Sequence, residues 1–353
     1  MAIMNGRLKK LMINEDVHAF GNRTSFSENP LIFCGSANHN LAGEVAQILQ
    51  LKLGGSSVER FPDGEIHVRI DESVRGRDTY IIQSTCPPVN ENLMELCIFL
   101  DTLRRASAAR VTAIIPYYGY SRQDRKVVGR EPITAKLVAN LLEAAGASRV
   151  LCVDLHSPAL QGFFEIGMDH LTASQSLANH LRQRDLSQSI IVSPDTGGVK
   201  RADVFSKILG LPLAILHKRR ESGDTVNVRA VIGDVSGKKP IIVDDIISTG
   251  STIREATDEL VRAGAEPDIS IVATHPIFVG KVTEKLDHPA IKRIIVTDSV
   301  PLRSDVTKKL RNIEVVSLAP LLADAVTRIH TGQSLSEMFL SQDNHGVSVR
   351  WSV

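Results

Sequence analysis

Several features that mark particular classes of protein are missing from this 353-residue sequence. It has only four cysteines, and no Cys-x-x-Cys pair or other metal-ligand spacing occurs among them. This pattern favours reduced, buried thiols over a disulfide framework or a zinc site. The amino terminus has no apolar signal-peptide core, and no apolar run reaches the roughly 20 residues of a membrane span. We therefore expect a cytoplasmic protein with no membrane partner.

A strong net charge is also missing, because 41 Lys and Arg residues face 40 Asp and Glu residues. Such a balance gives no global field to attract nucleic acid or an acidic membrane, so we expect no nucleic-acid partner and only local anion sites. Two common nucleotide-binding signatures do not occur either, the G-x-x-x-x-G-K-[ST] phosphate loop and the G-x-G-x-x-G dinucleotide fingerprint. If a nucleotide is bound, it is held in another way.

What the sequence does contain is a regular alternation of short β-rich runs and helical patterns. Strands are predicted over 31–34, 80–83, 111–115, 149–153, 189–193, 212–216, 241–243, 269–273 and 293–297. Helices are predicted over 39–51, 91–106, 132–145, 173–184, 199–209 and 252–264, where apolar residues follow the 3.6-residue period. The alternation predicts an α/β protein with mainly parallel sheets flanked by helices.

The number of predicted strands is too large for one ordinary doubly wound sheet, and the chain is long enough for two full cores. Two similar halves are therefore expected to meet near residues 155–172. The predicted division is an irregular extension over 1–28, domains over 29–168 and 169–341, and a tail over 342–353. A helix over 322–331 is expected to pack on one of the halves, and its pattern leaves open which one.

The most informative segment is 241–252, Ile-Ile-Val-Asp-Asp-Ile-Ile-Ser-Thr-Gly-Ser-Thr. An apolar strand leads into the adjacent carboxylates of Asp244 and Asp245, and a loop rich in hydroxyls and glycine then starts a helix. Backbone N–H groups at a helix start can wrap a phosphate, and carboxylates can hold sugar hydroxyls or a divalent cation. The segment therefore indicates a sugar-phosphate pocket, although an acidic turn with a helix cap would contain the same residues.

Four more polar clusters lie in the segments that follow predicted strands, where ligands bind in open α/β sheets. They are Arg122-Gln123-Asp124, Asp154-Leu155-His156, Asp195-Thr196-Gly197-Gly198 and Lys218-Arg219-Arg220. Each has a structural alternative, respectively a solvated loop, a satisfied histidine, a turn and a surface basic run. Their common position at strand ends favours a binding site over solvation alone.

Each cluster also suits a definite chemistry. A guanidinium such as that of Arg122 pairs with phosphate, and the Gln123 amide matches a purine edge. The imidazole of His156, opposite Asp195, can ligate a metal. The two consecutive glycines let a pyrophosphate approach the backbone closely. The basic run suits the charge that spreads in a phosphoryl-transfer transition state.

Longer motifs, found between about residue 30 and about residue 330, identify a family. They lie at 60–65 (RFPDGE), 73–76, 92–96, 116–126, 132–140, 154–156, 161–164, 218–220 and 243–252. In these segments the sequence resembles the ribose-phosphate diphosphokinases, or phosphoribosyl diphosphate (PRPP) synthases. The resemblance implies two tandem phosphoribosyltransferase-type domains and a reaction that depends on ATP and Mg²⁺. That reaction transfers the β,γ-diphosphoryl group of ATP to the C1 hydroxyl of D-ribose 5-phosphate, and yields PRPP for nucleotide, NAD, histidine and tryptophan synthesis, with AMP.

The same resemblance implies roles for individual residues. Transition-state cations would be Lys218 and Arg220. ATP contacts would be Phe61, Asp63, Glu65, Arg122, Gln123, Asp124 and His156, with the hairpin around Phe61 reaching in from a neighbouring subunit. Ribose 5-phosphate contacts would be Asp244 and Asp245 on the 2- and 3-hydroxyls and Ser248, Thr249, Gly250, Ser251 and Thr252 on the phosphate. The diphosphate loop would contain Asp195, Gly197 and Gly198, and the ligands of Mg²⁺ would be His156 and Asp195. A homo-oligomer based on dimers, a hexamer, is also implied.

One segment departs from the family pattern. The commonest members follow the basic run with a Pro-Arg-Pro-Asn-like segment, whereas this chain has Glu221-Ser222-Gly223-Asp224. The resemblance therefore does not carry phosphate activation or ADP inhibition over to this chain. A catalytically silent regulatory homologue is the alternative, but such proteins typically lose catalytic or metal residues that are present here. A PRPP-consuming phosphoribosyltransferase would be shorter and lack the second half. No residue stands out as a general base.

Overall fold

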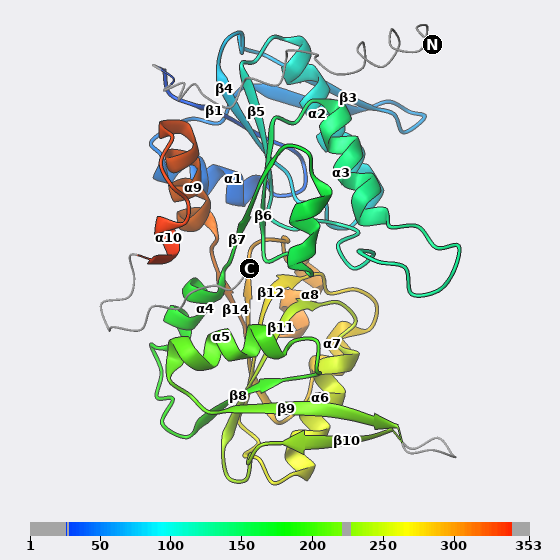
Figure 1. Ribbon diagram of the computed structural model, residues 1–353, viewed down its shortest axis with the longest axis vertical. Coiled ribbons are helices and arrows are strands. Elements are labelled where there is room, and N and C mark those ends of the chain that lie inside the picture. Colours follow the sequence, from blue (N-terminus) through cyan, green and yellow to red (C-terminus); the bar gives the residue numbers. More distant parts are fainter. Residues whose placement is uncertain (1–25, 27, 221–226, 341–353) are drawn as a thin grey trace, which may run out of the picture.

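The computed structural model describes residue 26 and residues 28–220 and 227–340. Its two main sheets lie one above the other in Figure 1. The first sheet has the order β1-β4-β5-β6-β7, with every pair parallel. The second has the order β10-β9-β8-β11-β12-β13-β14, parallel except for the β9–β10 pair. The predicted α/β class with mainly parallel sheets is confirmed.

The first half contains the amino-terminal sheet and the elements around it. Its strands are β1 (Leu31–Cys34), β4 (Asp78–Ile82), β5 (Arg110–Ile115), β6 (Arg149–Val153) and β7 (Gly167–Leu171). Its helices are α1 (His39–Ile48), α2 (Val89–Arg105), α3 (Thr134–Ala145) and a short 3₁₀ helix (Pro158–Phe163). Strands β2 (Ser56–Arg60) and β3 (Ile66–Ile70) form a separate antiparallel hairpin.

The second half contains the larger sheet. Its strands are β8 (Ser189–Ser193), β9 (Leu213–Arg220), β10 (Asn227–Ile232), β11 (Lys239–Ile247), β12 (Ile269–Pro276), β13 (Ile291–Thr297) and β14 (Ile313–Val316). Its helices are α4 (Ser174–Leu181), α5 (Val199–Leu209), α6 (Ser251–Arg262), α7 (Val282–Leu286), α8 (Ser304–Lys309), α9 (Ala319–Thr331) and α10 (Glu337–Leu340). The predicted extension and tail lie almost entirely outside the described residues.

The apolar cores follow from the alternation of side chains along each strand. In β1, for example, Ile32 belongs to one core and Phe33 to another on the opposite face. The core that contains Ile32 is continuous across one face of both sheets and includes residues of α1, α4, α5 and α9. The opposite faces have separate cores, with α2 and α3 on the first sheet and α6, α7 and α8 on the second. The two halves therefore share one layer of buried side chains.

Helix α9 packs on the first half. Its sequence pattern does not predict which half it contacts. It contacts α1, and Arg110 Nη2 donates to the carbonyl of Ile329 at 3.1 Å. His330 Nδ1 lies 2.7 Å from Oδ2 of the buried Asp78. The chain thus returns from the second half to the first (Figure 1).

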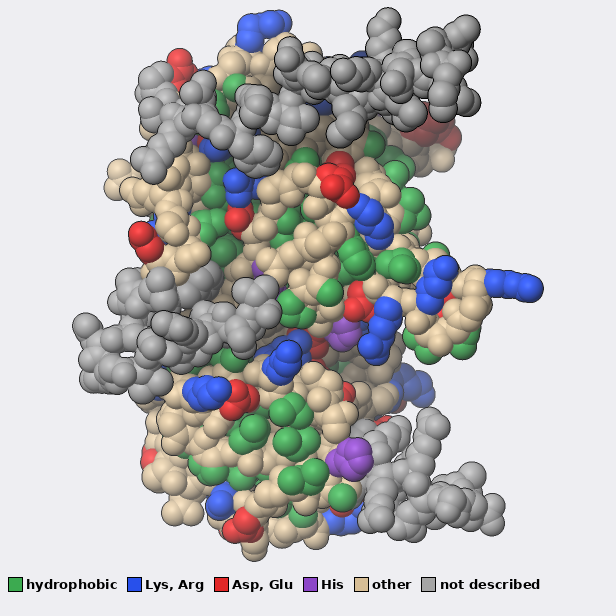
Figure 2. Space-filling model, viewed as in Figure 1, with side chains coloured by type: hydrophobic (Ala, Val, Ile, Leu, Met, Phe, Trp, Pro, Cys, Tyr) green, Lys and Arg blue, Asp and Glu red, His purple; other side chains and the backbone are tan. Residues whose placement is uncertain are grey.

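The four cysteines are free, and three of them are buried, in agreement with the prediction of reduced thiols. Burial raises the pKa of the Cys86 thiol to about 11 and so keeps it protonated. No helix among the described residues is long and apolar enough to cross a bilayer. The face shown in Figure 2 carries charged side chains of both signs, as the balanced composition leads one to expect.

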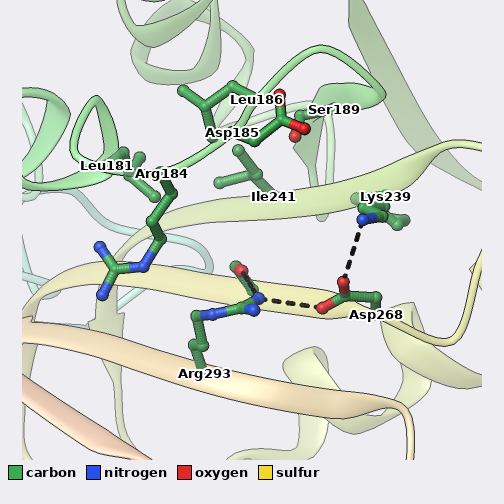
Figure 3. Close-up of a pocket in the computed structure, with 11 residues that line it drawn as sticks. Leu181, Arg184, Asp185, Leu186, Ser189, Lys239, Ile241, Asp268 and Arg293 are labelled. Atoms are coloured by element: carbon green, nitrogen blue, oxygen red, sulfur yellow. Dashed lines mark hydrogen bonds and ion pairs between the residues drawn. The ribbon is translucent and has the colours of Figure 1, made fainter.

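A cavity of about 210 Å³ lies at the amino-terminal edge of the second sheet (Figure 3). Its cations are already paired with carboxylates. Lys239 Nζ and Arg293 Nη1 lie 3.5 and 2.9 Å from the carboxylate of Asp268, and Arg184 pairs with Glu314. This edge is opposite to the carboxyl ends of the strands, where the polar clusters of the sequence lie.

Candidate active site

The carboxyl ends of the strands of both sheets meet at a seam between the halves (Figure 1). Thr274 Oγ1, at the end of β12, donates to Asp154 Oδ2 after β6 at 2.6 Å. His275 Nε2 lies 3.0 Å from the backbone carbonyl of Asp154, and His275 Nδ1 lies 2.9 Å from Ser299 Oγ. The loop after β6 is therefore joined to the ends of β12 and β13 in the second half.

His275 is buried, and burial lowers its pKa, so the neutral imidazole is favoured. Because a carbonyl can only accept, Nε2 carries the proton toward Asp154. The Ser299 hydroxyl, which lies beside Nδ1, donates to the carbonyl of Thr274 at 3.0 Å. Ser84 Oγ in turn donates to the carbonyl of Ser299 at 2.5 Å. These buried hydrogen bonds fix the segment that carries Asp154 and His156 against the second half.

The predicted sugar carboxylates lie within a strand rather than after it. Strand β11 continues to Ile247, because Asp244 to Ile247 still align with β12 after β8 has ended at Ser193. Asp245 is buried, and its Oδ2 lies 2.7 Å from His156 Nδ1, which belongs to the first half. The structure thus pairs His156 with one of the two predicted sugar carboxylates.

Arg201, near the start of α5, is a third member of this cluster. Its Nη2 lies 3.3 Å from Asp245 Oδ2, and its Nη1 lies 3.5 Å from Asp244 Oδ1. Burial and the adjacent Asp245 raise the pKa of Asp244 well above its usual range. Burial would raise the pKa of Asp245 too, but the hydrogen bond with His156 and the charge of Arg201 outweigh it and hold that pKa below its usual range. Asp245 is therefore the carboxyl that retains the negative charge.

The predicted phosphate loop joins β11 to α6. Gly250 occupies the left-handed region with φ +77° directly before the first helical residue, Ser251. The Val279 N–H donates to the carbonyl of Ser248 at 3.0 Å, and Thr249 Oγ1 lies 3.1 Å from Ser251 Oγ. The loop therefore combines helix-start N–H groups with hydroxyls, as a phosphate site requires.

The predicted diphosphate loop follows β8. The Gly198 N–H donates to Asp195 Oδ1 at 2.9 Å, and the second oxygen of this exposed carboxylate has no hydrogen-bond partner among the described residues. A Cβ on Gly198 would meet Ser193 Oγ at 3.0 Å and Arg201 Nη1 at 3.9 Å. The tight loop thus lies beside the guanidinium that pairs with Asp244 and Asp245.

The predicted ATP residues divide into two groups. Arg122, Gln123 and Asp124 lie in the loop after β5, where Arg122 is exposed and Gln123 Oε1 accepts from Thr134 Oγ1 at 2.5 Å. Burial raises the pKa of Tyr117 at the base of this loop, and the charge of Arg122 partly offsets the shift. That Tyr117 ring packs edge-on against His275, so the loop adjoins the seam.

The hairpin that carries Phe61, Asp63 and Glu65 is not brought to the seam. It projects from the far end of the first half (Figure 1), and the Phe61 side chain is 49% exposed. The Phe61 N–H donates to the Glu65 carbonyl at 2.9 Å, and the Glu65 N–H to Asp63 Oδ1 at 3.1 Å. The hairpin is thus a well-formed turn with an exposed aromatic tip.

Of the predicted transition-state cations, Lys218 and Arg220, the structure describes the backbone but not the side chains. The backbone of Lys218 and Arg220 lies within β9, which extends past the predicted end at 216, but their side chains are outside the described part. The segment 221–224 that departs from the family pattern also lies outside it. Among the described residues, no group of three or more His, Cys, Asp or Glu side chains is arranged to hold a metal by itself.

Two domain families match the chain. Residues 30–146 match the N-terminal domain of ribose phosphate pyrophosphokinase, and residues 225–340 match the phosphoribosyl synthetase-associated domain. The ribose-phosphate pyrophosphokinase of Caldanaerobacter subterraneus subsp. tengcongensis is 50% identical over 309 residues, which are 87% of this chain and 97% of that protein. The chain belongs to the ribose-phosphate pyrophosphokinase family.

Other relatives agree with this family. The ribose-phosphate pyrophosphokinase of Bacillus subtilis is 47% identical over 312 residues, 88% of this chain and 98% of that protein. The crystal structure of phosphoribosylpyrophosphate synthetase from Mycobacterium smegmatis superposes with a TM-score of 0.81 at 40% identity, and covers 86% of this chain and all of that one. The predicted family and fold are confirmed, and these ribose-phosphate pyrophosphokinases give no support to a silent regulatory homologue.

Sequence reasoning missed Arg201, Asp154 and His275 as site residues. Arg201 lies in a predicted amphipathic helix, where a charged residue is normally solvated, and His275 lies just beyond a predicted strand. Asp154 belongs to a predicted polar cluster, but the cluster pattern predicts no separate role for it. Because each acts through a contact with a distant segment, no local pattern identifies them.

Proposed function

We propose that this ribose-phosphate pyrophosphokinase transfers the β,γ-diphosphoryl group of ATP to the C1 hydroxyl of ribose 5-phosphate and so forms PRPP and AMP. One observation carries the proposal. The sugar-side carboxylates, His156 and the diphosphate loop of a chain 50% identical to a ribose-phosphate pyrophosphokinase converge at one seam. The four free cysteines support a reducing compartment, and we place the enzyme in the cytoplasm.

The second half would hold the sugar. Backbone N–H groups and hydroxyls of residues 248–252 would bind the 5-phosphate. The carboxyl oxygens of Asp244 and Asp245 would accept hydrogen bonds from the sugar hydroxyls. The sugar would thus be fixed at both ends, with C1 directed toward the diphosphate loop.

The first half would hold ATP. The exposed guanidinium of Arg122 suits the phosphates, and the Gln123 and Asp124 side chains suit the base and ribose. The N–H groups around Gly197 and Gly198 would receive the diphosphoryl group. Fixing both substrates on rigid strand ends converts a bimolecular step into a positioned one, which is worth roughly 7–11 kcal/mol in favourable cases.

The residues present are compatible with Mg²⁺ bound largely through substrate phosphates. This ion takes oxygen ligands, keeps several waters and typically uses only one or two carboxylates of the protein. Asp195 has an oxygen available, and the partly exposed His156 engages Asp245 through Nδ1 only. Bound there, Mg²⁺ would neutralise part of the charge on the transferred group. Lys218 and Arg220 would contribute further positive charge.

The proposal includes tandem phosphoribosyltransferase-type domains over 29–168 and 169–341 and a homo-oligomer based on dimers, a hexamer. The exposed Phe61 supports a shared site, because an aromatic side chain at the tip of a hairpin gains from burial against another subunit. In that arrangement the hairpin would cover the adenine of a neighbouring site.

The experiment is a coupled assay of AMP formation from ATP with and without ribose 5-phosphate and Mg²⁺. We expect AMP and PRPP in equal amounts and only when all three are present. AMP formation without ribose 5-phosphate, or none at all, would contradict the proposal. Repeating the assay with inorganic phosphate and with ADP would show whether either regulates this chain.

A further inference from the structure

Helix α7 packs directly against the phosphate loop. A Cβ on Gly250 would meet Val282 Cγ2 at 3.3 Å and Leu286 Cδ2 at 3.4 Å, so the buried face of α7 touches the turn of the loop. The preceding segment is joined to the loop by the hydrogen bond from Val279 to Ser248. Side chains on α7 are therefore held at a fixed distance from the loop.

Lys285, on α7, extends its ammonium to the loop itself. Its Nζ donates to Ser251 Oγ at 2.5 Å. Among the residues that the structure describes, this hydroxyl is the one side-chain partner of the ammonium, and no carboxylate lies within 4 Å of it. Lys281, one turn earlier, instead pairs with Glu284 at 3.7 Å. Since an ammonium has three donors, Lys285 keeps two N–H groups and an uncompensated charge beside the loop.

A phosphate bound in the loop would be stabilised by a positive charge that is not already paired. A phosphomonoester carries about −1.5 to −2 charges at neutral pH. Residues 248–252 contain no cation. Arg254, in the first turn of α6, is paired with Asp258 at 3.1 Å. Of these neighbours, Lys285 is the cation whose charge is not already balanced.

We propose that Lys285 is a binding residue for the 5-phosphate of the sugar, which it contacts together with Ser251. The inference rests on the proposed function, because it assigns a partner to the phosphate of that substrate. A charge-assisted hydrogen bond formed in this way stabilises the bound sugar phosphate in the ground state and the transition state equally. Its loss therefore raises the KM for ribose 5-phosphate and leaves kcat nearly unchanged.

The test compares Lys285→Met and Lys285→Arg with the matched control Lys281→Met at the N-cap of the same short helix. Calorimetric titration of the full-length enzyme with ribose 5-phosphate gives the affinity, and steady-state kinetics give the KM of each substrate. We expect Lys285→Met to weaken ribose 5-phosphate binding by about 10- to 100-fold. The KM for ATP and the melting temperature are expected to stay near wild type. The arginine variant should keep most of the affinity, and the Lys281 variant all of it.

Salt dependence separates a direct charge contact from a structural role. With one cation fewer at the phosphate, Lys285→Met should show a shallower loss of ribose 5-phosphate affinity as NaCl is raised. An affinity within twofold of wild type would overturn the inference, as would equal losses for both substrates with a lowered melting temperature and no rescue by arginine. If Lys285→Met gives either of these results and the wild-type enzyme forms PRPP, the proposed function stands although the inference about Lys285 fails. If wild type forms none, the proposed function itself has failed.

Discussion

Replacement of Arg201 by methionine removes the cation that pairs with Asp244 and Asp245 while keeping the apolar stem. Its guanidinium lies 3.3 and 3.5 Å from the carboxylates of Asp245 and Asp244. At these distances Coulomb's law gives about 5 kcal/mol per charged pair for an effective dielectric constant of about 20. The free-energy cost of burying the charged guanidinium offsets much of this Coulomb attraction, and the variant no longer has that cost. Breaking a buried pair typically costs about 3–5 kcal/mol, and since Arg201 is 23% exposed we expect a loss of about 2–4 kcal/mol at neutral pH.

The loss should depend on pH with a definite sign. In the wild type, the lowered pKa of Asp245 gives stability that is present above its usual range and lost in acid. Without the cation, the pKa of Asp245 rises and that of Asp244, already raised, rises further. A carboxyl whose pKa is raised by folding contributes stability only at low pH and loses it as the pH rises. The gap between wild type and variant should therefore widen from about pH 5 to about pH 8.

Urea unfolding followed by circular dichroism at these two pH values measures the gap. Lys207→Met, on the same helix, removes an exposed pair with Asp203 at 2.7 Å and should cost no more than about 0.5 kcal/mol. Adding Asp244→Asn to the Arg201 variant should recover much of the loss at high pH, because it removes the repulsion between the two carboxyls. A loss that is the same at both pH values, or larger in acid, would refute this account of the cluster.

Three further predictions concern the activity. Lys218→Ala should lower kcat by at least about a hundredfold while the KM for ATP changes little, since its charge is expected to act in the transition state; equal losses in both would argue against that role. Mixing a Phe61→Ala variant with the Lys218 variant should restore part of the activity in hybrid oligomers, and the absence of any recovery would exclude a shared site. Gly250→Ala should cost about 1–2 kcal/mol, because φ +77° strains any residue with a Cβ, and should raise the KM for ribose 5-phosphate; an unchanged melting temperature and KM would contradict it.

The sequence predicted the elements of the parallel sheets well, because buried parallel strands such as β5 and β12 are continuous apolar runs between helical patterns. It missed strands with few apolar residues, for example β7, whose residues are only partly buried up to Leu171. It also ended β11 too early. Carboxylates normally terminate a strand pattern, but pairing with β12 carries the strand through Asp244 and Asp245.

Local motifs predict a set of candidate residues for the site but not the contacts between them. Local motifs placed Asp245 with the sugar and His156 with the metal, whereas the structure puts the two side chains in contact across the seam. That contact depends on how the halves dock, which no local pattern encodes. The same holds for Lys285, whose place beside Ser251 follows from the packing of α7 on the loop.

The layer of apolar side chains that runs across both sheets has a consequence for how the molecule loses its structure. Because α9 starts from the second half and buries its apolar face on α1 of the first, unfolding of either half exposes side chains that stabilise the other. We therefore expect the two halves to unfold as one cooperative unit. A substitution deep in either half thus changes the population of the intact site as much as one beside the substrates.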